Sequence, residues 1–169
     1  MKTLLSLALL LLIPSLLAGC GFRPIYGSQA ANGESSVAME LNNIAIDNIP
    51  DRDGQMLRND LIDHLYGKSR PSKPAYTLKI IIRSAEEDLG ILANATATRS
   101  LIDMYGDYSL LDAKGKVLLK GTAHSVASFD KLDQIFATVA ARQDAHQRTL
   151  NEMSEQIVNR LSLYFSERK

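Results

Sequence analysis

Cysteine is nearly absent from this chain, because Cys20 is the only one among its 169 residues. A single thiol cannot form an intramolecular disulfide, so the fold must rest on its hydrophobic core. An excess of charge of either sign is also missing, since 19 basic residues face 19 acidic ones. A chain without net positive charge lacks the field of a general nucleic-acid binder, and an anionic partner would need a local basic cluster.

Catalytic and metal-binding motifs are missing as well. The sequence has no Gly-x-Ser-x-Gly, Walker, dinucleotide-binding, His-Glu-x-x-His or Cys-x-x-Cys pattern. The three histidines, His64, His124 and His146, are far apart in the chain. The acidic segment 51–54 resembles the start of a calcium loop, but the twelfth position is Ile62 where such a loop needs glutamate. We therefore predict a non-enzymatic protein without catalytic residues, a metal site or a bound cofactor.

The N-terminus carries the most informative pattern. Lys2 precedes an apolar run from Leu4 to Leu12, and Pro14 interrupts the run well before the roughly 20 residues that a membrane span needs. A basic residue, a short apolar region and small residues before Cys20 are typical of a secretory signal. We predict that residues 1–19 are a cleaved signal peptide. Its removal takes away Lys2, which leaves 18 basic residues against 19 acidic ones.

The tetrapeptide Leu17-Ala18-Gly19-Cys20 resembles the bacterial lipobox. That resemblance implies that Cys20 becomes the mature N-terminus and carries a diacylglycerol and an N-acyl chain, which together hold a protein stably at a membrane. Gly21 replaces the aspartate that favours inner-membrane retention in enterobacterial lipoproteins, and so implies the outer membrane. Residues 20–36, rich in Gly, Ser, Ala and Asn, are predicted to form a lipidated tether. The alternative is a cleaved signal followed by an ordinary thiol.

Residues 37–169 are predicted to form a single α+β domain. Apolar residues alternate from Val37 to Ile46 with a phase shift near Asn42, which predicts a strand with a bulge. After Pro50, acids that suit a helix N-terminus precede one helical apolar face, made of Leu57, Leu61, Ile62 and Leu65.

Three further strands and a last helix follow. A two-residue apolar period marks strands within 76–82, 102–110 and 117–129, and the segment Asp112–Gly115 predicts a hairpin turn between the last two. Leu150, Met153, Ile157, Leu161 and Tyr164 repeat at helical spacing, and the polar segment 141–148 is expected to project from the core. The order β-α-β-β-β-α predicts a two-layer sandwich, with a four-stranded, mostly antiparallel sheet and two helices on one face.

The residues after the lipobox resemble a known family. Cys20–Gly27 is similar to the Cys-Gly-Phe-x-Pro-Leu-Tyr-Gly opening of alphaproteobacterial lipopolysaccharide-assembly lipoproteins, the LptE family. Residues 49–59 resemble the entry to that family's first helix, and residues 140–145 the start of its last helix. The resemblance implies a lipoprotein on the periplasmic side of the outer membrane. It would sit in the lumen of an LptD-type β-barrel as plug and assembly factor, one to one, and bind lipopolysaccharide.

A different role stays open on the residues alone: an accessory of another outer-membrane machine, such as a barrel-assembly or secretin pilot factor. For the lipopolysaccharide reading, Arg99 and Arg142 are the predicted contacts, because phosphates favour guanidinium groups beside apolar surface. Both could instead be solvated or paired with acids such as Asp144.

The segment after the lipidated cysteine is the second predicted contact region. Its aromatic and basic side chains suit a barrel wall or membrane surface, and the residues are Phe22, Arg23, Pro24 and Tyr26. The alternative is a spacer that Pro24 stiffens.

Overall fold

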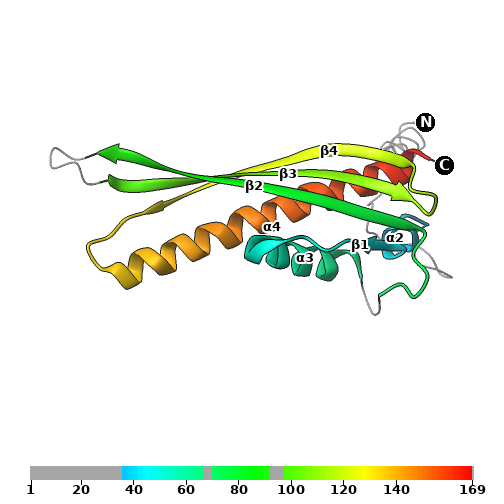
Figure 1. Ribbon diagram of the computed structural model, residues 1–169, viewed down its shortest axis with the longest axis horizontal. Helices are drawn as coiled ribbons and strands as arrows, with labels where there is room; N and C mark the ends of the chain where they lie inside the picture. The colour runs from blue at the N-terminus through cyan, green and yellow to red at the C-terminus, as the bar shows by residue number, and fades with distance from the viewer. Residues whose placement is uncertain (1–35, 67–69, 92–96, 169) are drawn as a thin grey trace, which may run out of the picture. The chain divides into compact units, whose positions relative to one another are not determined.

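Four strands form one sheet in the order β1-β2-β3-β4 (Figure 1). The computed structural model describes residues 36–66, 70–91 and 97–168. β1 (Ile44–Ile46) pairs in parallel with β2 (Tyr76–Ile91), and β2, β3 (Ala97–Asp112) and β4 (Val117–Asp130) form an antiparallel meander. The predicted α+β fold with a four-stranded, mostly antiparallel sheet is therefore confirmed. Cys20 and the segment 22–26 lie outside the described residues.

Helices α3 (Asp51–Leu65) and α4 (Ile135–Glu167) cover one face of this sheet (Figure 1). Alternate strand residues point toward them, as the two-residue period predicts. The large apolar side chains that are completely buried in this layer come from both helices and from three strands: Ile44, Leu57, Leu61, Leu78, Ile102, Met104, Leu110, Leu150, Met153, Ile157 and Leu161. None of the helices in the described ranges has the length and apolarity of a membrane span.

The predicted strand over 37–46 is wrong in its first half. Residues Ser36–Asn42 form the short helix α2, and only Ile44–Ile46 is a strand. Val37 and Leu41 are four residues apart and both buried, whereas Met39 between them is 48% exposed. A strand would place all three on one face, so the burial fits helical spacing and not alternation.

The last helix also differs from its prediction, because α4 begins at Ile135 and the polar segment 141–148 does not project. Ala145 within it is completely buried, and Arg142 and Arg148 both reach the sheet. The predicted turn is confirmed: the Gly115 N–H donates to the Asp112 carbonyl, and Gly115 has a φ of 79°.

The two long edges of the sheet differ in the partners of their backbone groups. At the β4 edge, the Gln156 side chain of α4 accepts from the His124 N–H at 3.2 Å and donates to the His124 carbonyl at 2.9 Å. Arg148 donates to the Ser128 carbonyl at 3.2 Å. At the other edge, β1 pairs only with residues 76–78 of β2.

Candidate functional site

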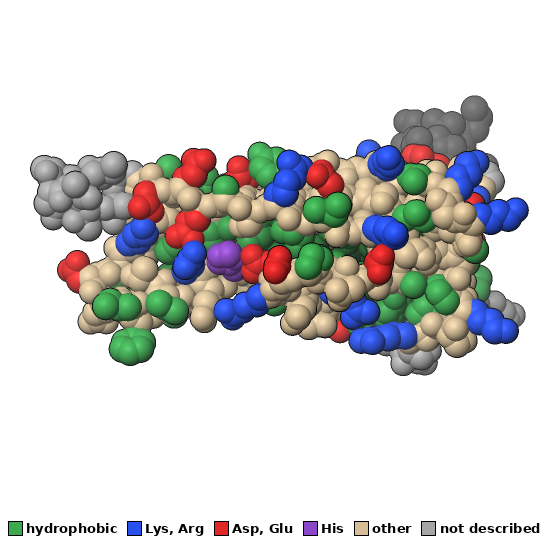
Figure 2. Space-filling view, viewed as in Figure 1, with side chains coloured by type: hydrophobic (Ala, Val, Ile, Leu, Met, Phe, Trp, Pro, Cys, Tyr) green, Lys and Arg blue, Asp and Glu red, His purple; other side chains and the backbone are tan. Residues whose placement is uncertain are grey.

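Large apolar side chains are exposed where α4 begins. Ile135 is 78% and Phe136 91% exposed, and Leu132 and Val139 flank them with about half of their surface in solvent. The Thr138 hydroxyl accepts from the Leu132 N–H and donates to the Leu132 carbonyl, which fixes the turn into the helix. We call these four apolar residues the apolar tip. Figure 2 shows hydrophobic side chains gathered at the lower left, where Figure 1 places the start of α4.

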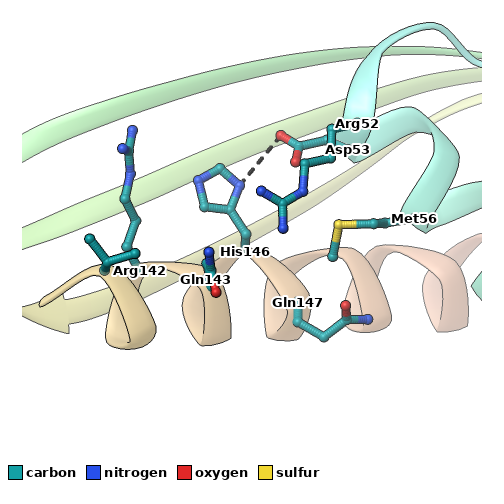
Figure 3. Close-up of a pocket in the computed structure, with 8 residues that line it drawn as sticks. Arg52, Asp53, Met56, Arg142, Gln143, His146 and Gln147 are labelled. Carbon is teal, nitrogen blue, oxygen red and sulfur yellow. Dashed lines mark ion pairs between the residues drawn. The ribbon is translucent and has the colours of Figure 1, made fainter. Parts of the chain in front are cut away.

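A cavity of about 470 Å³ opens next to the apolar tip, between α3 and α4 (Figure 3). Val139 lines it and also belongs to the tip, so the two surfaces are continuous. The other lining residues are Arg142, Gln143, His146 and Gln147 from α4 and Arg52, Asp53 and Met56 from α3. The site therefore joins apolar and cationic groups.

The charges around the cavity are partly balanced. Arg142 forms an ion pair with Glu86 of β2 at 2.5 Å. The His146 ring points toward Asp53 (Figure 3), with Nδ1 at 3.4 Å from the carboxylate. Arg52 has no acidic partner within the described ranges. An anion entering here would meet one uncompensated guanidinium and one already paired with a carboxylate.

The two predicted lipopolysaccharide contacts do not lie together. Arg99 is opposite Asp130 in the β3–β4 register, on the face away from the helices, and its Nε donates to the Asp130 carboxylate at 2.8 Å. This hydrogen bond raises the pKa of the Arg99 guanidinium. Arg142 lies on the helix side of the sheet. Both arginines are ion-paired, and Asp144 pairs with Arg148 instead.

The sequence interpretation did not predict the apolar tip as a contact region, and among the cavity-lining residues it proposed only Arg142 as a contact. Ile135 and Val139 are four residues apart, a spacing that extends the last helix upstream and could have revealed its true start. No sequence signal brings Arg52 into the same cavity as Arg142, because α3 and α4 meet only through tertiary packing. Among the described residues, no cluster of His, Cys, Asp and Glu could hold a metal ion.

Solved structures share this fold. A candidate lipoprotein from Caulobacter crescentus is 29% identical, with a TM-score of 0.64, over 79% of this chain and 97% of that one. Lipoprotein B from Nitrosomonas europaea is 17% identical, with a TM-score of 0.58, over 73% of this chain and 83% of that one. A minor lipoprotein from Acinetobacter baumannii is 14% identical, with a TM-score of 0.54, over 71% and 90% of the two chains. A comparison with curated proteins gives no match.

The three structures named above share the α+β fold of this chain and carry lipoprotein names, which defines the class. Within that class, the sequence profile of the LptE family, described as lipopolysaccharide-assembly, matches residues 41–161. The chain therefore belongs to the LptE family. This family is non-enzymatic and works with the lipopolysaccharide transport machinery of the cell envelope, which agrees with the prediction of a protein without a catalytic site.

Proposed function

We propose that the protein is anchored to the outer membrane through acyl chains on Cys20 and acts as plug and assembly factor of an LptD-type β-barrel, one to one. The membership of the family and the lipobox-like residues 17–20 support this assignment. In this arrangement Phe22, Arg23, Pro24 and Tyr26 contact the barrel wall or the membrane surface.

The same proposal includes binding of lipopolysaccharide at the apolar tip, and the observation that carries it is the continuity of the tip with the cavity. Lipopolysaccharide combines acyl chains with phosphates. Phe136 and Ile135 offer exposed apolar surface, and Arg52 and Arg142 line the adjoining cavity together with Val139 of the tip. Guanidinium groups bind phosphate through paired, charge-assisted hydrogen bonds.

The expected contribution of each arginine to phosphate binding depends on whether it already forms an ion pair. Arg52 can bind a phosphate without breaking an ion pair, whereas a phosphate at Arg142 must share the guanidinium with Glu86. Arg99 is a separate proposed contact on the other sheet face, where Asp130 already compensates its charge. Arg99→Gln should therefore weaken binding less than Arg52→Gln does.

The double variant Ile135→Ser/Phe136→Ser tests the tip. Burying one such side chain contributes about 1.5–3 kcal/mol, so its affinity for purified lipopolysaccharide should fall more than tenfold. Leu163→Ser is the matched control, because Leu163 is exposed on the same helix near its other end. Equal affinity in the double variant and the control, with both folded, would contradict the binding site.

Lipid attachment and barrel assembly need separate tests. Labelled fatty acid should enter the wild-type chain and not Cys20→Ser, and label persisting in that variant would refute the anchor. Deleting the gene in its host should leave the barrel poorly assembled. Alanine at Phe22 and Tyr26 should reduce recovery of the barrel with the purified protein while affinity for lipopolysaccharide is unchanged.

A further inference from the structure

Within residues 36–66, 70–91 and 97–168, nothing pairs with the β2 edge beyond β1 over most of its length. The Tyr76 N–H donates to the Asn43 carbonyl, and the Leu78 carbonyl accepts from the Asp47 N–H at 2.9 Å, so even-numbered residues of β2 turn their backbone groups toward β1. By the two-residue period, the backbone groups of Ile82, Ser84, Glu86 and Asp88 face the same edge. No strand or helix side chain in the described ranges bonds to them there.

Open edges of this length are unusual, because a row of free N–H and C=O groups is a template for another strand. At the opposite edge of the sheet, Gln156 and Arg148 of α4 bond to the backbone groups of His124 and Ser128. The open stretch runs from Lys79 to Ile91. Its midpoint is Ala85.

On the sheet face away from the helices, the side chains on either side of Ala85 form a self-complementary pattern. Ile81 and Leu89 are apolar and exposed, at 68% and 39%, and Arg83 and Glu87 lie inside them with opposite charges. In an antiparallel pair centred on Ala85, Ile81 lies opposite the partner's Leu89 and Arg83 opposite the partner's Glu87. Cross-strand pairs of this kind stabilise a sheet, and like charges directly opposite destabilise it.

The alternative registers lose this match. Sliding the partner by two residues places Arg83 opposite either the partner's Ala85 or the partner's Leu89. The centred register also has the correct hydrogen-bond parity, because Ser84 meets the partner's Glu86 with both sets of backbone groups facing each other. In this register, pairing extends over the whole open stretch from Lys79 to Ile91 in both copies.

The acidic side chains on the helix-facing side of β2 do not prevent two copies from pairing by charge repulsion. Glu86 is compensated by Arg142 at 2.5 Å, and Asp88 accepts hydrogen bonds from Lys131 and Ser100. Arg83 contacts Asp107 at 2.6 Å, but a guanidinium has five donors and can bind a second carboxylate.

We infer that the open β2 edge is a self-association surface: two copies of the chain pair antiparallel through β2, with Ala85 on the two-fold axis, and join their sheets into one. This goes beyond the proposed function and concerns the chain before it engages a barrel. The pairing needs neither the apolar tip nor the cavity.

A cysteine at the axis tests the geometry. In the full-length chain carrying Cys20→Ser, Ala85→Cys is the only thiol, and directly opposite residues lie about 4.5–5.5 Å apart between Cα atoms, within reach of a disulfide. Mild oxidation should give a covalent dimer. Lys79→Cys is the matched control on the same strand and face, and in this register it lies far from its own copy. A yield no higher for Ala85→Cys than for Lys79→Cys would overturn the inference.

Charge exchange tests the register independently. Glu87→Lys places two lysines opposite arginines, and Arg83→Glu places two glutamates opposite glutamates. Sedimentation velocity should show dimer affinity falling about tenfold in each variant alone and recovering in an equimolar mixture, where every pair has opposite charges. Equal association of both single variants and the mixture would refute the register. A wild-type chain that stays monomeric throughout would overturn self-association.

Discussion

The C-terminal half of α4 buries Met153, Ile157 and Leu161 completely, whereas Ile135 and Phe136 in its first turn are 78% and 91% exposed. Both regions use the same kinds of side chain on one continuous helix. At the C-terminal half, the sheet and α3 cover the apolar stripe, which contributes to folding. At the tip no described element covers it, so the same chemistry is available for binding.

The largest expected effect separates these regions by stability. Leu161→Ala should lower the free energy of unfolding by about 2–5 kcal/mol, because it removes buried methylene groups and leaves a cavity. Phe136→Ala should change it by less than about 0.5 kcal/mol, since its ring is already in water. Urea unfolding measures both. Similar losses in the two variants would mean that the tip is part of the core.

A second substitution tests how closely the sheet is packed. A Cβ at Gly121 would lie 2.3 Å from the Tyr108 hydroxyl oxygen and 2.5 Å from the adjoining ring carbon. Gly121→Ala must therefore displace the buried Tyr108 ring, at a cost of about 1–3 kcal/mol in stability. Lys120→Ala, on the exposed face next to it, is the control. If both variants unfold at the same urea concentration, the ring has room to move.

The sequence predicted those parts of the fold in which the spacing of apolar residues fits only one kind of secondary structure. The alternation of Leu78, Ile80 and their counterparts on β3 fits only a strand, and the stripe from Leu150 to Leu161 fits only a helix. At residues 37–41 the apolar positions fit a strand and a helical i, i+4 pair equally well, and packing against α4 decided between them. Similarly, the ion pairs of Arg99 and Arg142 depend on strand register and helix docking, which no local pattern specifies.

A third prediction concerns the β4 edge, where α4 side chains bond to the backbone, for comparison with the open β2 edge. Gln156→Glu keeps the acceptor for the His124 N–H and loses the donor to the His124 carbonyl. We expect a loss of about 0.5–1.5 kcal/mol in the free energy of unfolding, typical of one hydrogen bond. Glu155→Gln on the exposed side of the helix is the matched control. An unchanged stability would show that solvent replaces the lost bond.

The smallest effects are pH dependences of opposite sign. Hydrogen bonds from Lys131 and Ser100 lower the pKa of Asp88 near the tip, so its contribution to stability is present above pH about 4 and is lost as the pH falls through its folded value. Burial raises the pKa of Asp60 in α3, so its ionisation lowers stability as the pH rises above about 4. Unfolding of Asp88→Asn and Asp60→Asn between pH 3 and 7 should therefore deviate from the wild type in opposite directions. Parallel profiles would contradict these environments.

The position of α4 at the end of the chain has a consequence for biogenesis. The β2–β3–β4 meander contains only neighbouring pairings, which form quickly as a chain emerges. Its apolar face stays uncovered until the residues after Leu150 are available. A chain that becomes available from its N-terminus would therefore keep this apolar sheet face exposed to association with other chains until α4 follows.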